Sequence, residues 1–218
     1  MKDLMALQDA LQKDLAWRKR ELSSIKVSAT LASDADGHTF RSGHVLACSH
    51  WEGFLKKALT LYIEHVFAQK MALKKFEPFV VALAFFKDVK KAGEANYPGS
   101  TQHHLALAEV MPSVLDAHPT RATWDIDTEG NPGEKVLEKL IRSTGLDPKL
   151  GMQDATWETT KKFINEQLLK DRNAIAHGSG IPIGRTDLVE RVDRLLKILD
   201  AVNDEVMACA TQKRYVRP

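Results

Sequence analysis

The sequence has few of the residues that bind metal ions or form disulfide bonds. Only two of its 218 residues are cysteines, Cys48 and Cys209, and both fall in apolar helical patterns. Their spacing fits neither a zinc ligand set nor a disulfide framework. We therefore expect two small buried side chains. No glycine-rich phosphate loop and no zinc-protease helix motif occurs. The sequence predicts no metal and no cofactor.

Long apolar runs and an excess of charge of one sign are also absent. No stretch approaches the roughly 18 uncharged apolar residues that span a membrane. The first 22 residues carry charges throughout and do not resemble a signal peptide. The 31 basic and 29 acidic residues nearly cancel, so net charge neither demands nor excludes a nucleic-acid partner. We expect a cytoplasmic protein with no membrane contact.

Two local patterns resemble metal sites but lack the required ligands. Asp125–Gly130 opens like a calcium loop, yet its twelfth position, which needs a bidentate glutamate, is Val136. His103 and His104 are adjacent, so on a helix their side chains point about 100° apart. Together with His118 they have no further ligand at metal-binding spacing. A polar turn and solvent-facing histidines are the favoured interpretations.

Helical periodicity dominates the residues that are present. We predict helices over residues 3–31, 40–69, 78–91, 101–117, 134–143, 155–177 and from about 187 onward, with the fourth bent or ended at Pro112. The irregular insertion at 118–133 contains a stretch, 120–127, that could form one short strand, and we expect the tail 212–218 to be frayed. The simplest interpretation is one all-α domain spanning 1–218. It would be a bundle of long antiparallel helices with extra short helices and one irregular insertion.

Lysines recur along the second and third predicted helices and the segment between them. A solvated helix face is the favoured interpretation, although lysines that converged in space would follow a phosphate backbone. The lysines are Lys56, Lys57, Lys70, Lys74, Lys75, Lys87, Lys90 and Lys91.

One predicted helix ends with the stretch DRNAIAHGSG, residues 171–180. Asn173 and His177 are four residues apart and share a face. Arg172 and His177 are five apart, about 140° around and about 7.5 Å along an ideal helix, so their heads do not meet within one helix. Arg172 lies at the edge of an apolar stripe, where a guanidinium needs an anionic partner. The alternative is that both cations only favour the helix dipole before an ordinary glycine stop at Gly178.

A second polar group lies in the apolar stretch HWEGF of the second predicted helix. Glu52 is one turn before Lys56, so a surface ion pair is one interpretation. A carboxylate among large apolar groups also suggests a buried partner, and Arg172 is the natural candidate; Glu52 could equally orient His177. His50 could be a second proton carrier, although a packed, hydrogen-bonded histidine is favoured.

These stretches resemble known sequences in the same order. The motif at residues 172–177 resembles the R-N-x-x-x-H signature of HEPN domains, helical domains that include many prokaryotic ribonucleases. HWEGF at 50–54, following DLAWR at 14–18, resembles the corresponding segment of the MAE-type HEPN-like nucleases, the RiboL-PSP-HEPN-like branch. WDIDTEGN at 124–131 and Gly178 also match this branch. The resemblance covers nearly the whole chain.

The resemblance implies a helical bundle that forms a homodimer through its signature helices, so that two motifs share one cleft. It also implies a metal-independent endoribonuclease that uses the ribose 2′-hydroxyl as nucleophile and leaves a cyclic phosphate. Such proteins are frequently toxins or defence effectors encoded beside an antitoxin or another neighbouring-gene partner. The alternative is a non-catalytic HEPN module that binds a nucleotide, an RNA or a partner protein. A purely structural helical adaptor is a third reading.

The resemblance assigns roles to three residues of the signature, and the chemistry of their side chains is compatible with them. Arg172 would bind the scissile phosphate through two parallel hydrogen bonds. Asn173 would orient the phosphate or the imidazole of His177. His177 would transfer protons near neutral pH as general base or acid. Glu52, His50 and Lys56 are expected to support the site.

Overall fold

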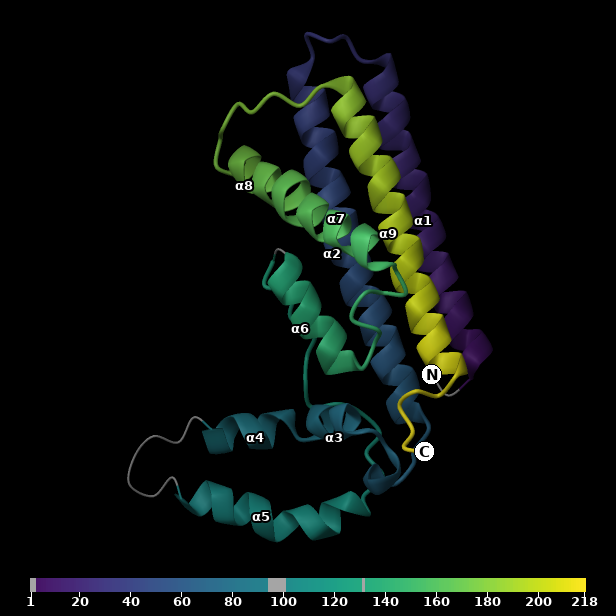
Figure 1. Ribbon diagram of the computed structural model, residues 1–218, viewed down its shortest axis with the longest axis vertical. Helices are drawn as coiled ribbons and strands as arrows, with labels where there is room; N and C mark the ends of the chain where they lie inside the picture. Colours follow the sequence, from purple (N-terminus) through teal and green to yellow (C-terminus); the bar gives the residue numbers. More distant parts are fainter. Residues whose placement is uncertain (1–2, 94–100, 131) are drawn as a thin grey trace.

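Three long helices form an elongated bundle in the computed structural model. The structure describes residues 3–93, 101–130 and 132–218, except for the side chains at 91–93, 101, 103, 104, 106, 110 and 113. Figure 1 shows α1 (Leu4–Leu31) running antiparallel to α2 (Gly37–Ala68) and α9 (Arg185–Thr211). Within the described ranges the ordered elements are helices and one isolated bridge, with no strand. The predicted all-α bundle is therefore confirmed.

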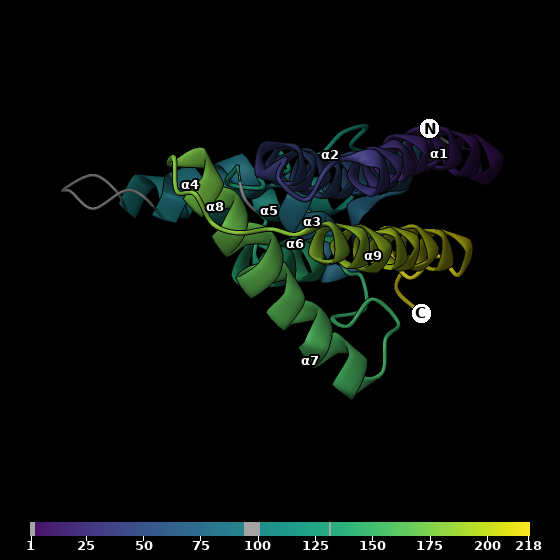
Figure 2. The same ribbon diagram turned by 90° about the horizontal axis from the view of Figure 1, so that it is seen from above.

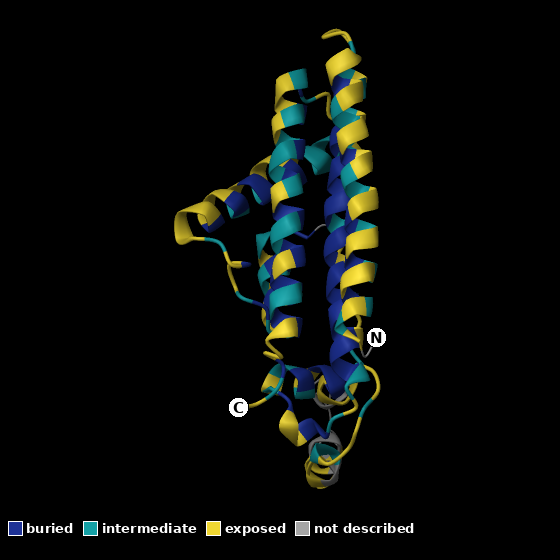
Figure 3. Cartoon of the chain, turned by 90° about the vertical axis from the view of Figure 1, so that its right-hand side faces the viewer, coloured by how far each residue is buried: buried dark blue, intermediate teal, exposed yellow. Residues whose placement is uncertain are grey.

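The bundle is held together by apolar stripes at helical spacing. On α1 the buried leucines are Leu7, Leu11, Leu15 and Leu22. Successive members are four or seven residues apart, so they lie on one face of the helix, and burying each contributes roughly 1.5–3 kcal/mol. Figure 3 shows the resulting pattern, with buried surface turned inward and exposed surface outward along each long helix.

A group of short helices lies across one end of the bundle, at the bottom of Figure 1. It comprises η1 (Leu73–Lys75), α3 (Pro78–Ala84), α4 (Phe86–Gly93) and α5 (Thr101–Leu115), and α5 continues through Pro112.

The single helix predicted over 78–91 is wrong, because the chain breaks between α3 and α4 at Phe85. Thr123 explains the break. Its hydroxyl donates to the carbonyls of Leu83 and Ala84, at 3.3 and 3.0 Å, and accepts from the main-chain N–H of Lys87 at 3.3 Å.

The irregular insertion joins this end layer to α6 (Glu134–Thr144), which contacts the helix that carries residues 172–177, the motif helix. The short strand considered at 120–127 is wrong, because these residues form neither a strand nor a bridge. The insertion leads into α6, which ends, as predicted, at Gly145 with φ of 67°. The amide of Asn165 accepts from the N–H of Glu134 at 2.9 Å and donates to its carboxylate at 2.8 Å. These bonds fix the start of α6 against the motif helix.

The motif helix crosses the bundle at an angle, as Figures 1 and 2 show from two directions. Residues 155–177 were predicted as one α-helix, but the structure has three consecutive stretches: α7 (Asp154–Lys162), a π-helical stretch η2 (Phe163–Leu169) and α8 (Lys170–Ala176). A π-helix holds more residues per turn, so it changes which side chains face the bundle.

The C-terminal tail packs against the segment before α3, so the prediction of a frayed tail at 212–218 is wrong for residues 215–217. Tyr215 is only 2% exposed, and its ring packs against Phe76 at a centroid distance of 6.2 Å. Its carbonyl accepts from Glu77 N–H at 2.9 Å, and the N–H of Arg217 donates to the carbonyl of Lys75 at 3.0 Å. These bonds tie the tail to the segment before α3.

Over the described ranges, none of the helices combines the length with the apolar character that crossing a membrane requires.

Candidate functional site

The signature residues occupy the last turns of the motif helix, and Gly178 determines how that helix ends. Gly178 has φ of +81°, a left-handed conformation that glycine adopts without a steric penalty. Its N–H donates to the carbonyl of Ile175 at 3.0 Å, and that of Ser179 to Ala174 at 2.8 Å, the bonding pattern of a Schellman motif. His177 is the C-cap residue, and its side chain is exposed.

Arg172 and Asn173 are half-buried and joined to each other. The guanidinium of Arg172 donates to the amide oxygen of Asn173 at 3.1 Å. Both residues lie in regular α-helix, because the π-helical stretch ends at Leu169. The angular separation of about 140° between Arg172 and His177 therefore applies, and within one copy of the chain the guanidinium and the imidazole do not point to the same place.

The turn that precedes the signature is fixed to the bundle through its main-chain carbonyls. The carbonyl of Leu168 accepts from His44 Nε2 at 3.1 Å and from the thiol of Cys48 at 3.5 Å, both on α2. The neighbouring carbonyl of Gln167 accepts from Arg191 of α9 at 3.1 Å. Donors from two long helices thus bind adjacent carbonyls of the π-helical stretch. We name Gln167, Leu168 and Asp171, together with their partners His44, Cys48 and Arg191, the clamped turn.

Arg191 also forms an ion pair with Asp171, the residue immediately before the signature. Their N–O distance is 2.7 Å, and the side chains are 14% and 22% exposed. Arg191 further approaches His44 Nδ1 at 3.5 Å. This geometry requires the His44 tautomer that carries its proton on Nε2, because Nδ1 faces a donor and Nε2 faces a carbonyl.

Burial and the positive charge of Arg191 lower the pKa of His44 to about 4. His44 is therefore neutral at physiological pH, and the tautomer it needs is available. Burial has the opposite effect on the neighbouring thiol, raising the pKa of Cys48 to about 12 despite the nearby guanidinium of Arg172. Cys48 is thus a packed thiol and not a nucleophile. Both cysteines are buried, as predicted.

Glu52 contacts the insertion. Thr128, which is 3% exposed, donates its hydroxyl to Glu52 Oε1 at 2.7 Å. The neighbouring indole of Trp51 donates to the carbonyl of Pro132 at 3.2 Å. Among the described residues no ion pair joins Glu52 to Arg172, so the expected buried partner is replaced by a hydroxyl from the insertion.

His50 and Lys56 lie apart from the signature. His50 is 8% exposed, packs edge-to-face on Trp17 at 5.3 Å and is turned about 160° around α2 from Cys48. Burial, and secondarily the charge of Arg18, lower the pKa of His50. The packed-histidine interpretation therefore fits. Lys56 is exposed, and within the described ranges it forms no ion pair with Glu52.

The two metal-like patterns form ordinary polar contacts. The carboxylate of Asp127 accepts from the N–H of Glu129 at 2.8 Å, and Glu129 pairs with Lys139 at 2.9 Å. His118 lies on the surface with Nδ1 2.7 Å from the carbonyl of Lys70. The side chains of His103 and His104 lie outside the described residues. In the described part of the chain no three His, Cys, Asp or Glu side chains are grouped as metal ligands.

The lysines of the second and third predicted helices are exposed, and they are spread from the middle of α2 to α4. Lys74 forms an ion pair with Asp116, and the side chain of Lys91 lies outside the described residues. The solvated-face interpretation fits these positions.

The residues of the clamped turn were not predicted from the sequence. Arg191 flanks the apolar stripe that contains Leu188 and Val192, and a cation beside a buried stripe was a signal that it has a polar partner. Asp171 adjoins the signature directly. His44 gave a weaker signal, because histidine on an apolar face is common without any role.

A protein-family model described as RiboL-PSP-HEPN matches residues 13–208. The matched range includes the HWEGF stretch, the insertion, the clamped turn and the whole signature. No curated protein and no solved structure matches the chain.

Proposed function

Because the chain belongs to the RiboL-PSP-HEPN family, whose shared domain is generally ribonuclease-like or nucleotide-binding, we propose that it is a metal-independent endoribonuclease. One observation carries the proposal. The chain has the complete set of Arg172, Asn173 and His177, and presents it at an accessible helix end behind a turn that is fixed to two long helices. A pure binding module has no special need for a histidine five residues after the arginine.

The substrate supplies its own nucleophile in this reaction. The ribose 2′-hydroxyl attacks the adjacent phosphorus, and the bond from phosphorus to the 5′-oxygen of the next nucleotide breaks. The products are a 2′,3′-cyclic phosphate and a free 5′-hydroxyl. His177 removes the proton of the attacking hydroxyl, and His177 of a second copy of the chain, in the shared cleft proposed below, protonates the leaving 5′-oxygen. Arg172 binds the phosphoryl oxygens as their negative charge grows, and Asn173 orients the phosphate.

The magnitudes are sufficient without a further catalytic group. A preorganised donor to a developing oxyanion contributes roughly 3–4 kcal/mol, or about 10²–10³ in rate. A positioned general acid or base contributes typically 10²–10⁴. Arg172 and His177 together therefore account for a modest ribonuclease.

We propose that two copies share one cleft. Arg172 and His177 face different directions on one helix, so the arginine of one copy can approach the histidine of the other where two signature helices cross. Ala174 is half-buried and Ala176 is exposed, and their small side chains let a second helix come close. Sedimentation analysis at micromolar concentration is expected to give a dimer, and an active monomer would contradict the shared cleft.

We place this activity in a toxin–antitoxin or defence setting, in which a neighbouring gene encodes a restraining partner. Expression of the wild-type chain is then expected to arrest growth, while the His177→Ala variant is tolerated. Growth arrest by both forms would contradict a toxicity that depends on cleavage.

The function is tested by incubating mixed cellular RNA with the purified chain in the presence of EDTA. Wild type is compared with His177→Ala, Arg172→Ala and the control Lys162→Ala, an exposed cation earlier on the same long helix. We expect the first two variants to lose at least about 100-fold in rate and the control to match wild type. Circular dichroism verifies that each variant is folded.

Cleavage at the same rate by wild type, Arg172→Ala and His177→Ala would show that the signature residues take no part in catalysis. Absence of cleavage by wild type, together with nucleotide or RNA binding that depends on Arg172, would favour the non-catalytic HEPN module.

A further inference from the structure

The exposed face of α6 carries a row of positive charges. Lys135, Lys139 and Arg142 lie within about 60° of one another around the helix and span about 10 Å along it. All three are exposed. Lys139 pairs with Glu129 in a solvent-exposed contact, whereas the side chains of Lys135 and Arg142 form no ion pair or hydrogen bond within the described part of the chain. A surface pair of this kind contributes little, so an anionic ligand can compete for Lys139.

The two acidic residues of α6, Glu134 and Glu138, contact a cation of the motif helix, which also pairs with Glu158 at 2.9 Å. Lys161 of α7 lies 3.1 Å from the carboxylate of Glu134 and 3.9 Å from that of Glu138. Both carboxylates therefore lie on the part of α6 that adjoins the motif helix. The middle of the basic row is about 70° around α6 from Glu138 and about 110° from Glu134, so its three cations outnumber Glu129, the carboxylate that pairs with Lys139.

The row ends at a cavity with aromatic walls. The cavity has a volume of about 280 Å³ and lies between α3, α4, the insertion and the end of α6. Its walls include Phe79, Phe86, Trp124 and Arg142. The rings of Phe86 and Trp124 meet at 64° with centroids 6.4 Å apart, and Phe86 is 40% exposed. This volume is near the lower end of small-ligand sites, which suits one flat ring.

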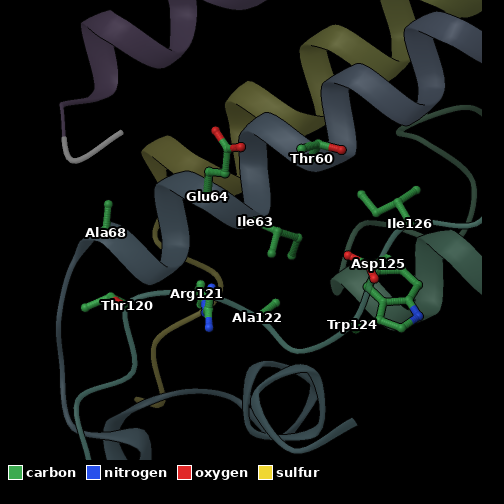
Figure 4. Close-up of a pocket in the computed structure, with 10 residues that line it drawn as sticks. All are labelled: Thr60, Ile63, Glu64, Ala68, Thr120, Arg121, Ala122, Trp124, Asp125 and Ile126. Atoms are coloured by element: carbon green, nitrogen blue, oxygen red, sulfur yellow. The ribbon is translucent and has the colours of Figure 1, made fainter. Parts of the chain in front are cut away.

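The chemistry of the cavity fits a nucleobase with its phosphate. Bases stack on aromatic side chains with little dependence on sequence, and an unpaired guanidinium beside the rings binds a phosphate. On the other side of Trp124 lies a larger cavity of about 360 Å³, shown in Figure 4. That cavity is lined by Glu64 and Asp125 as well as Arg121, and its carboxylates disfavour a phosphate.

The cavity and the signature lie on the same side of the molecule. In Figure 1, α8, α6 and α4 follow one another along one side of the bundle, and Figure 2 shows them at similar depth. Hydrogen bonds between Asn165 and Glu134 fix the start of α6 to the motif helix. The basic row therefore leads from the motif helix to the aromatic cavity.

We propose that a single-stranded RNA segment lies along Lys135, Lys139 and Arg142, and that one of its unpaired bases stacks in the cavity against Phe86 and Trp124. The choice of RNA as the ligand rests on the proposed ribonuclease function. The site holds substrate at a distance from the scissile phosphate and selects single strands, because a paired base is not available for stacking.

The test measures binding of a fluorescent 2′-O-methyl oligoadenylate, which cannot be cleaved because its 2′-oxygens are blocked. The full chain is titrated and fluorescence anisotropy is recorded. We expect Trp124→Ala, Phe86→Ala and Arg142→Ala each to weaken binding by about 10-fold, the range for losing one stacked base or its phosphate contact. Arg142→Ala should also reduce the dependence of log Kd on log salt concentration by about one.

Matched controls lie on α1. Trp17→Ala removes another partly exposed tryptophan and Arg20→Ala another exposed arginine, and both should bind like wild type. Phe86→Ala removes a surface ring and carries little risk of unfolding, and thermal denaturation verifies the fold of Trp124→Ala. Equal binding by wild type and all three site variants would overturn the proposal.

Further measurements distinguish RNA from a mononucleotide as the ligand, and the binding site from the proposed ribonuclease function. Full displacement of the oligonucleotide by AMP, with no effect of Lys135→Ala, would replace the RNA path by a mononucleotide site. A duplex that binds as well as the single strand would also overturn it. If wild type binds the oligonucleotide through Trp124 but cleaves no RNA, the proposed ribonuclease function is wrong and the binding site is supported. If wild type cleaves RNA and the three site variants bind like wild type, the ribonuclease function is supported and the binding site is wrong.

Discussion

The motif helix contains two successive stretches that are held in opposite ways. In the clamped turn, carbonyls of Gln167 and Leu168 accept hydrogen bonds from α9 and α2, and Asp171 pairs with Arg191. In the stretch that follows, Arg172 and Asn173 are half-buried, and His177 is exposed at the C-cap.

The difference indicates how this fold presents a polar motif. Reactive groups must be accessible, yet they must also be held in a defined geometry, and an exposed helix end by itself frays. Here the geometry comes from the preceding turn, where buried donors on α2 and a half-buried donor on α9 meet the wider π-helical stretch. Substitutions in the clamped turn should therefore act on stability first, and substitutions in the exposed stretch on chemistry first.

Arg191→Ala is expected to produce the largest loss of stability. It leaves the Asp171 carboxylate unpaired at low exposure, and removes the donor to Gln167 and His44. Breaking a buried pair costs about 3–5 kcal/mol, and because this pair is partly solvated we expect about 3–4 kcal/mol. Urea denaturation at neutral pH measures the loss.

The control for this prediction is Arg194→Ala. Arg194 is on the same helix, stacks on Phe163 at 4.2 Å and donates to the carbonyl of Thr159, but forms no ion pair among the described residues. Its loss should cost about 1 kcal/mol. Equal losses for the two variants would show that the ion pair is not what fixes the turn.

The pH dependence of stability is the next largest expected effect. Burial and Arg191 lower the pKa of His44 in the folded chain to about 4, below its ordinary value near 6.5. The unfolded chain therefore binds this proton more tightly. The stabilisation from neutral His44 is complete above about pH 6.5 and is lost as pH falls toward 4, amounting to about 3 kcal/mol.

Denaturation at several pH values tests this assignment. His44→Gln should flatten the profile between pH 7 and pH 4 relative to wild type, whereas His38→Gln, at an exposed histidine of α2, should leave it unchanged. A profile that is unaffected by His44→Gln would mean that other groups cause the acid sensitivity.

Thr128→Val should have a smaller effect, because it removes one hydrogen bond at nearly constant shape. The half-buried carboxylate of Glu52 then loses its hydroxyl donor, which costs about 1–2 kcal/mol. Chemical denaturation measures it, with Thr120→Val, at an exposed residue of the insertion, as the control. If cleavage falls more than stability explains, Glu52 acts on the signature and not only on the insertion.

Gly178→Ala tests the exposed stretch and has the smallest expected effect on stability. The φ of +81° disfavours any Cβ by about 1 kcal/mol, although an added Cβ would meet no atom within 4 Å. Gly180→Ala is the matched control, because its Cβ also meets nothing and its φ is not positive. We expect Gly178→Ala to lower the thermal midpoint slightly and to reduce cleavage, since it displaces His177. Equal thermal midpoints and equal cleavage rates for the two variants would show that the conformation of Gly178 does not position His177.

Much of the fold could be predicted because its signals are local. The leucine spacing of α1, the glycine stops at Gly145 and Gly178, and the proline at the start of α3 each act through neighbours within one turn. The break at Phe85 could not be predicted, because the residue that causes it, Thr123, is far away in the sequence. The docked tail was missed for the same reason.

The candidate site was predictable in part. The resemblance of residues 172–177 to the HEPN signature pointed to Arg172, Asn173 and His177, and their place at a helix end followed from the next glycine. The partner of Glu52 did not follow, since a carboxylate in an apolar stretch signals that a partner exists but not which one. Thr128, 76 residues away, is supplied only by the path of the insertion.

The sequence by itself determined most of the helices, their apolar faces and the order of the signature residues, because main-chain hydrogen bonds and side-chain periodicity depend on near neighbours. Only the tertiary structure decided that His44 and Leu168, 124 residues apart, meet at a π-helical turn, and that Arg191 reaches Asp171. A buried polar group takes whichever donor or acceptor the packed helices bring within about 3 Å, and that choice is made by the packing of the whole bundle.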